Sequence, residues 1–307
     1  MSPGATAQRG RLSATGGWCG LYAASWCVLA LATASAAEPA VAEAPTTEAP
    51  AVAQTRAADL IAEPRVLVIA HRGASIAAPE NTLPAFEAAL NSNSDLVELD
   101  YHHTADGVPL VIHDETLDRT TDARDLFGGH DLHVDRKPLA ELLKLDAGLW
   151  FGARFAGTRL PTLEESLDLV QRRAVTLIER KAGDAKTCVA LLERKALVPH
   201  VVVQSFDWDF LADCHRLAPQ LTLGALGSKE LTPERLAGLA RTGAKVVGWH
   251  HDHLDRAAIE LLHKEGYRVW AYTVDDRREA QGLIEAGVDG IITNDPGRMR
   301  AWVDKPR

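Results

Sequence analysis

Residues 68–82 read VIAHRGASIAAPENT, an apolar strand-like run that ends abruptly in a histidine, an arginine and a glycine. A surface turn is the simplest explanation, because all three are ordinary loop residues. An anion site is the alternative, because a cation and a titratable imidazole stand beside a residue without Cβ, which lets a ligand approach the backbone closely. The tripeptide alone does not decide between them, so the choice depends on the rest of the chain.

Short Val-, Ile- and Leu-rich runs alternate with helical patterns from residue 58 onward, and eight such runs are found. Most of their starts are about 20 to 30 residues apart, the length of one strand–helix unit. Near-continuous apolar strands, each followed by a helix, predict a parallel sheet. Eight units over about 250 residues favour a closed (β/α)8 TIM barrel over an open doubly wound sheet, and no G-x-G-x-x-G follows the first run. The runs are 66–70, 96–100, 175–179, 201–205, 221–226, 244–249, 268–273 and 290–293.

The spacing is broken once, between the second and third runs, which lie about 75 residues apart. This gap holds an extra strand-like run at 108–114, directly after the turn TADG at 104–107. Asp-Gly between apolar runs is a strong hairpin signal. The sequence therefore predicts an insertion at about 102–162, folded over one end of the barrel.

Polar side chains gather at the carboxyl ends of the runs, where TIM barrels build their active sites. The spacing of two between Glu98 and Asp100 puts both carboxylates on one face of their strand. Any single polar residue here could be a solvated strand end, but three carboxylates, two cations and histidines at one mouth indicate a site. The candidates on the runs are His71, Arg72, Glu98, Asp100, Glu179, Lys181, Trp270 and Tyr272, and we expect Trp270 to bind substrate.

Glu98, Asp100 and Glu179 form an all-oxygen ligand set without cysteine. Such a set suits one hard divalent cation, Ca²⁺ or Mg²⁺, rather than zinc or copper. The alternative is that one of these carboxylates makes a structural ion pair with Lys181 or Arg72.

Arg72 and Lys181 are suited to hold phosphate oxygens, the arginine through its fork and the lysine as a point charge. His71 and His113 end apolar runs near this mouth, and two imidazoles can act as base toward a nucleophile and as acid toward a leaving alkoxide. With a metal and an arginine stabilising charge, this set can cleave a phosphodiester. The remaining histidines close to a strand end are His250, His251 and His253.

The chain resembles the glycerophosphodiester phosphodiesterase family from about residue 67 to residue 296. The resemblance lies in HRGASIAAPENTLPAFEAAL, LVELDYHHTADGVPLVIHDETLDRTT, LDAGLWFGARFAGTRLPTLEE, LIERK, QSFDWDFL, WAYTVDD and GVDGIITNDP, in this order. It implies a TIM barrel with an insertion after the second strand that hydrolyses glycerophosphodiesters, such as deacylated phospholipids, to sn-glycerol 3-phosphate and an alcohol.

The resemblance also implies roles for particular residues. His71 and His113 become the catalytic acid/base pair, and Glu98, Asp100 and Glu179 become the metal ligands. Arg72 and Lys181 become phosphate contacts, and Glu80 a supporting residue at the site.

Three other functions remain as alternatives. Lipid-acting phospholipase C-like or sphingomyelinase D-like enzymes share the fold and the two-histidine chemistry. Metal-dependent amidohydrolases are also barrels, and residues 251–253 offer a His-x-His pair, although that class needs the pair on its first strand. A non-enzymatic binding barrel would be expected to lack a ligand or a histidine, and none is missing here.

The N-terminus has the pattern of a secretory signal peptide. Arg9 and Arg11 precede an uncharged, largely apolar stretch that ends in the small-residue sequence ASA at 34–36. We expect a signal peptide at 1–37, a flexible Ala/Pro/Thr/Glu linker at 38–60 and the catalytic domain at 61–307. The protein is then periplasmic or secreted, with an uncleaved membrane anchor as the alternative.

The charge of the chain bears on its partners. A formal net charge of −9 argues against nucleic acid or an anionic membrane as the main partner, since both bind basic faces. We therefore expect a small-molecule substrate held in a local basic pocket. Export favours Ca²⁺ slightly over Mg²⁺, because weak Ca²⁺ sites are usable outside the cytoplasm. Cys188 and Cys214 lie in expected helices, either as a disulfide or as two buried thiols.

Overall fold

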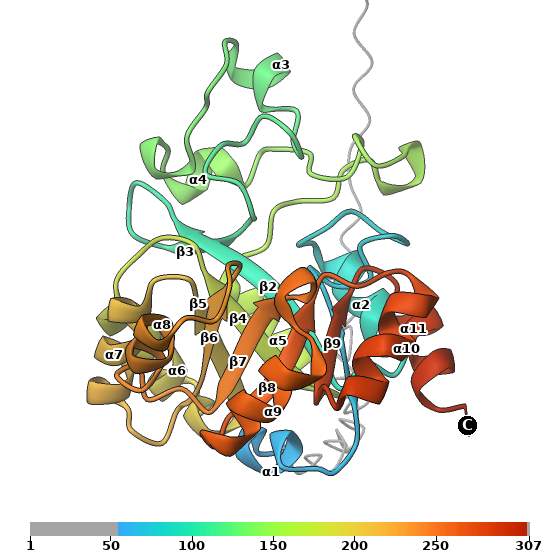
Figure 1. The fold of residues 1–307 in the computed structure, drawn as a ribbon. Helices are drawn as coiled ribbons and strands as arrows, with labels where there is room; N and C mark the ends of the chain where they lie inside the picture. The colour runs from blue at the N-terminus through green and yellow to red at the C-terminus, as the bar shows by residue number, and fades with distance from the viewer. Residues whose placement is uncertain (1–54, 306–307) are drawn as a thin grey trace, which may run out of the picture. The chain divides into compact units, whose positions relative to one another are not determined.

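The computed structural model describes residues 55–305, in which the strands form one nine-stranded sheet (Figure 1). β1 pairs with β9 on one side and with β2 on the other, so eight parallel strands close into a barrel. The expected TIM barrel is thus confirmed. The strands are β1 Leu67–Ala70, β2 Leu96–His103, β3 Pro109–Val111, β4 Val175–Arg180, β5 Val201–Ser205, β6 Thr222–Gly227, β7 Val246–His250, β8 Arg268–Tyr272 and β9 Gly290–Thr293.

Helices alternate with the strands and surround the barrel (Figure 1). Most begin at an Asp or Thr whose side chain accepts a hydrogen bond from a backbone N–H of the first turn; Thr162 and Glu165 form a complete capping box. These caps start each helix soon after its strand-end loop. The helices are α2 Leu83–Asn91, α5 Leu163–Val170, α6 Ala185–Arg194, α7 Trp208–Leu217, α8 Pro233–Leu239, α9 Arg256–Lys264, α10 Arg277–Ala286 and α11 Pro296–Val303.

The barrel interior is packed with apolar side chains, including Leu67, Leu96 and Trp270. The short helix α1, Ala57–Ile61, adds Leu60 and Ile61 to this same cluster. Our linker boundary was therefore wrong at its end, since residues 57–60 belong to the folded barrel. The reason is their spacing: Ala57, Leu60 and Ile61 share one helical face that is buried. The expected signal peptide at 1–37 and the expected linker as far as residue 54 lie outside the described residues.

The expected insertion follows β2, which continues three residues farther than predicted before it turns into antiparallel β3. The turn depends on Gly107, whose φ is +78°. Beyond β3 come α3 Ala123–Phe127, α4 Leu139–Leu142 and three-residue turns, above the carboxyl ends of the strands (Figure 1). A separate apolar cluster that includes Leu110, Leu142 and Leu160 holds the insertion together.

Cys188 in α6 and Cys214 in α7 are buried free thiols within the described part of the chain. Across residues 55–305, no helix combines the length and apolar character that a membrane span requires.

Candidate active site

The tripeptide His71-Arg72-Gly73 at the end of β1 adopts an unusual backbone conformation, and this conformation explains its composition. Arg72 and Gly73 both have positive φ values, +55° and +80°. A Cβ on Gly73 would lie 2.6 Å from the carbonyl carbon of Ala85 in α2, so only glycine fits there. This turn directs the Arg72 backbone N–H to Glu98 Oε2 at 2.7 Å. The turn at the end of β1 thus brings the polar residues that follow this strand against the Glu98 carboxylate of β2.

Three carboxylates converge at the ends of β2 and β4, as predicted. Glu98, Asp100 and Glu179 are buried, and one oxygen of each lies within 4.8 Å of the others. Among the residues that the structure describes, Glu98 Oε1 finds no hydrogen-bond partner, and Asp100 Oδ1 has only an ion-pair contact of 3.1 Å with Lys181 Nζ. Buried acceptors are rarely left without a donor. An all-oxygen set with unfilled acceptor positions fits a divalent cation such as Ca²⁺ or Mg²⁺.

The pKa values of these carboxyls show how crowded the negative charges are. Burial, followed by the charges of Asp100 and Glu179, raises the pKa of Glu98 well above its usual range. Burial and Asp100 likewise raise the pKa of Glu179 to about 7. Burial also opposes ionisation of Asp100, but Lys181 and Arg72 outweigh it and lower the pKa of Asp100 to about 2. Without a bound cation, the cluster therefore retains protons that a metal would displace.

Arg72 and Lys181 lie at this site, where both contact carboxylates. Arg72 Nη1 donates to Glu80 Oε1 at 2.8 Å, and Arg72 Nε lies 3.3 Å from Asp100 Oδ2. Lys181 Nζ contacts both Asp100 and Glu179. The ion pairs that we considered as an alternative to metal binding by the carboxylates are thus present, and they hold both cations beside the carboxylate cluster.

His71 ends β1 and lines a cavity of about 30 Å³ together with Glu98 and Glu179. Its Nδ1 lies 2.8 Å from Asn294 Oδ1, and the Asn294 side-chain amide donates to Asp275. Since this assigns Asn294 Oδ1 as an acceptor, His71 Nδ1 carries the proton and Nε2 is the free nitrogen. Burial and the charge of Arg72 lower the pKa of His71 to about 4. The imidazole is consequently neutral at ordinary pH.

His113 reaches the same site from the insertion, and a proton on it lowers the pKa of His71. Its Nδ1 lies 2.7 Å from Asp114 Oδ1. Arg119 then binds Asp114 through Nε at 2.6 Å and Glu80 through both terminal nitrogens. Burial lowers the pKa of His113 below its usual value; the charge of Asp100 and the hydrogen bond to Asp114 act in the opposite direction and offset part of this shift. The two imidazoles therefore differ in their partners: a neutral amide for His71 and a carboxylate for His113.

Sequence reasoning missed several residues that orient the site. Asn81, with a φ of +57°, donates from Nδ2 to Asp100 Oδ2 at 2.8 Å and accepts from the Asp100 backbone N–H. Asn294 and the pair Asp114–Arg119 orient the two histidines. These residues lie in the motifs PENT at 79–82, TND at 293–295 and HDETLDR at 113–119. Asp114 is adjacent to His113, whereas Asn81 and Asn294 bind side chains that are distant in sequence.

Our assignment of Trp270 to substrate binding is wrong. Its side chain is fully buried in the interior cluster of the barrel, among Leu67 and Leu96. Tyr272, two residues farther along β8, lines the cavity instead. Both side chains point inward because the strand repeats every two residues, and Trp270 lies one layer too deep to reach the mouth.

Comparison with known proteins agrees with this arrangement. Residues 71–298 match the glycerophosphoryl diester phosphodiesterase family. A glycerophosphodiester phosphodiesterase of Caldanaerobacter subterraneus is 37% identical over 250 residues, covering 78% of this chain and 99% of that protein. One from Bacillus subtilis is 34% identical over 260 residues, covering 78% of this chain and 86% of that protein.

Solved structures show the same fold. A phosphodiesterase of Oleispira antarctica, solved with the product sn-glycerol-3-phosphate, superposes with a TM-score of 0.70 at 29% identity, covering 78% of this chain and 97% of that one. A glycerophosphodiester phosphodiesterase of Agrobacterium tumefaciens gives a TM-score of 0.66 at 31% identity, covering 77% and 99%. By its sequence, its barrel and its cluster of strand-end carboxylates, this chain belongs to the glycerophosphoryl diester phosphodiesterase family.

Proposed function

We propose that this protein is an enzyme that hydrolyses glycerophosphodiesters to sn-glycerol 3-phosphate and an alcohol. The single observation that carries the proposal is the meeting of two differently partnered histidines with a buried carboxylate cluster at one barrel mouth. In the reaction an oxygen nucleophile forms a bond to phosphorus, the bond from phosphorus to the alcohol oxygen breaks, and one proton moves at each of these oxygens.

His71 is the general base. Its Nδ1–H is committed to Asn294, so the free Nε2 can accept the proton of the attacking hydroxyl. That hydroxyl belongs either to water or to C2 of the glycerol, which would give a cyclic phosphate first. The lowered pKa keeps Nε2 unprotonated at neutral pH.

His113 is the general acid. The Asp114 carboxylate accepts from its Nδ1 and favours the protonated ring, so that Nε2 can give a proton to the leaving alkoxide. Arg119 holds Asp114 in place and ties it to Glu80 on the barrel side of the mouth. This salt-bridged chain orients the acid relative to the phosphate site.

Glu98, Asp100 and Glu179 would hold one divalent cation, Ca²⁺ or Mg²⁺, which would supply Lewis-acid stabilisation of the charge that develops on the phosphoryl group. Two cationic side chains of the protein would add to this charge stabilisation. Arg72 and Lys181 contact the same carboxylates, and both cations would bind phosphate oxygens when the substrate enters.

The test is to incubate the purified protein with glycerophosphocholine and measure sn-glycerol 3-phosphate with a coupled dehydrogenase assay. Lysophosphatidylcholine and sphingomyelin are the parallel substrates, because they represent the lipid-acting enzymes of the same fold. Product from glycerophosphocholine alone supports the proposal. Cleavage of the lipids with none of glycerophosphocholine would move the protein to the lipid-acting class.

Replacing Arg72 by lysine should lower kcat/KM by an amount worth roughly 1 to 3 kcal/mol. Lysine keeps the positive charge but loses the fork that can bind two phosphate oxygens. The matched control is Arg65→Lys, an exposed arginine paired with Glu63 on the surface, which should leave the kinetics unchanged. Steady-state kinetics on glycerophosphocholine measure both. Ordinary kinetics for Arg72→Lys would mean that Arg72 has only a structural role.

Replacing Asp114 by asparagine should move the alkaline limb of the kcat/KM pH profile to lower pH. The hydrogen bond that His113 donates to Asp114 raises the pKa of His113, so removing the carboxylate lowers that pKa and the acid loses its proton at a lower pH. The acid limb, set by protonation of His71, should stay in place. A profile that moves only on its acid side would reverse the two roles.

We also propose that the protein is exported to the periplasm or beyond, from the signal-like pattern at 1–37. Its substrate is a small glycerophosphodiester, and the acidic net charge does not favour nucleic acid or membrane as a partner.

A further inference from the structure

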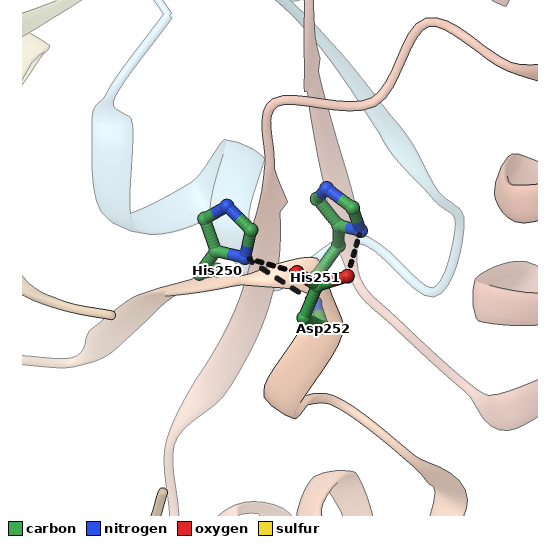
Figure 2. Close-up of side chains that lie close together, drawn as sticks. All are labelled: His250, His251 and Asp252. Carbon is green, nitrogen blue, oxygen red and sulfur yellow. Dashed lines mark hydrogen bonds and ion pairs between the residues drawn. The ribbon is translucent and has the colours of Figure 1, made fainter. Parts of the chain in front are cut away.

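A second cluster of metal-ligating side chains lies at the end of β7, apart from the carboxylate cluster. His250 is the last residue of β7, and His251 and Asp252 follow in a three-residue turn. One ligand atom of each lies within 4.8 Å of the others. Figure 2 shows both imidazoles directed at the Asp252 carboxylate, one from each side.

The contacts within this cluster are mostly long, and the Asp252 backbone N–H donates to His250 Nδ1 at 3.4 Å. His250 Nδ1 lies 3.6 Å from Asp252 Oδ2, and His251 Nδ1 lies 3.4 Å from Asp252 Oδ1. Both distances exceed those of charge-assisted hydrogen bonds. Asp252 is 68% exposed, so its carboxylate is free to turn toward a ligand. The one close contact joins His251 Nδ1 to Glu279 of α10, which brings a second carboxylate to the same imidazole.

The donor set differs from that of the first cluster. Glu98, Asp100 and Glu179 offer only oxygens, whereas this cluster offers two imidazole nitrogens with one or two carboxylates. Imidazole suits Zn²⁺, Ni²⁺ and Cu²⁺, while carboxylates alone suit Mg²⁺ and Ca²⁺. Zn²⁺ commonly takes three or four such ligands in a tetrahedral arrangement.

The position of the cluster connects it to the active-site cavity. His250 pairs with Tyr272 across β7 and β8, and the two rings meet edge to face at 5.8 Å between centroids. Tyr272 in turn lines the cavity that contains His71 and meets Phe206 edge to face. A metal at His250 would therefore lie beside the wall of the catalytic cavity.

We propose that His250, His251 and Asp252, with Glu279 as a further ligand, form a second metal site selective for Zn²⁺ and related transition ions. The site lies at the barrel mouth, separate from the Ca²⁺ or Mg²⁺ site. It does not depend on the proposed hydrolysis, since it rests on the donor atoms alone.

The test is calorimetric titration of the full chain with ZnCl₂ after its thiols have been alkylated, with saturating Ca²⁺ or Mg²⁺ present to occupy the carboxylate site. We expect one zinc equivalent that His251→Ala loses or binds about tenfold or more weakly. His250→Ala is the second variant, because His251 also holds α10 through Glu279, whereas His250 has no such ion pair. Thermal melts confirm that each variant is folded.

Two controls separate the sites. His130→Ala removes an exposed histidine of the insertion and should keep the zinc equivalent. Glu98→Gln, which disables the carboxylate site, should keep it as well. Zinc binding that is equal in all variants, or lost in Glu98→Gln but not in the histidine variants, would overturn the proposal. So would wild-type protein that takes up no zinc under these conditions.

Discussion

Replacing either His71 or His113 by alanine is expected to reduce kcat on glycerophosphocholine by on the order of 10² to 10⁴-fold. Each imidazole moves one proton in the transition state, and neither can do the work of the other because their partners differ. His71 Nδ1 contacts the Asn294 amide oxygen and His113 Nδ1 contacts the Asp114 carboxylate, which is why we propose His71 as the base and His113 as the acid.

The double variant should lose less than the product of the two single effects, because residues that act as a unit are not additive. Melting temperatures should remain within a few degrees of wild type, since neither ring belongs to an apolar core cluster. His263→Ala is the matched control. That ring bonds Asp289 at 2.8 Å, far from the carboxylate cluster, so its loss should affect stability and leave kcat unchanged.

Near-normal turnover by either single variant would contradict the assigned acid/base pair. The role would then pass to another imidazole at the barrel mouth, and His251 is the next candidate. The measurement that tests the assignment is kcat of both single variants at saturating substrate.

Replacing Glu98 by glutamine is expected to abolish metal-dependent activity, with a loss on the order of 10² to 10³-fold or more in kcat. Glutamine keeps an oxygen that can accept from the Arg72 N–H, so the turn at the end of β1 is preserved. What it removes is one negative charge from the ligand set, together with Oε1, which has no partner within the described residues.

The same substitution should separate metal binding from folding. In wild type, a cation at 100 times its dissociation constant stabilises the fold by about 2.7 kcal/mol, so Ca²⁺ or Mg²⁺ should raise Tm. In Glu98→Gln that rise should be lost. The metal-free variant should be no less stable than metal-free wild type, because the crowding that raises the pKa of Glu98 is relieved.

Exposed Glu164, which pairs with Arg194 and Lys195, supplies the control Glu164→Gln, expected to behave as wild type. Activity that survives a chelator, or a Glu98→Gln enzyme with unchanged turnover and an unchanged metal-dependent Tm, would rule out the metal site as assigned.

Much of the site could be predicted from the sequence because of two simple regularities. Parallel strands in a barrel bring their carboxyl ends to one mouth, so polar residues at the ends of separate runs must meet. Side chains also repeat every two residues along a strand, so Glu98 and Asp100 had to share a face. These regularities placed the three carboxylates, Arg72 and Lys181 together without knowledge of any long-range contact.

Depth along the barrel axis was not predictable in the same way. Trp270 and Tyr272 share the inward face, and the repeat of two does not say which layer each occupies. The register between β8 and its neighbours decides it: Trp270 pairs with Gly248 and Gly290. A Cβ on Gly290 would lie 2.6 Å from the indole of Trp270, so the missing side chain of Gly290 leaves room for the indole inside the barrel. Likewise, residues 57–61 bury their apolar face against the interior cluster of the barrel. The local sequence does not show which surface this face covers, because that surface forms only when the barrel closes.

By itself, the sequence determined the fold class, the insertion and the chemical types gathered at the mouth, because apolar periodicity and strand-end polarity are local properties. Only the tertiary structure decided which partner each catalytic group has. Asn294 reaches His71 across 223 residues of chain because β9 closes the barrel against β1, and Arg119 reaches Glu80 because the insertion folds over the mouth. Such partners set the tautomer and the pKa of each imidazole, and they depend on hydrogen-bond geometry between segments whose proximity no local pattern encodes.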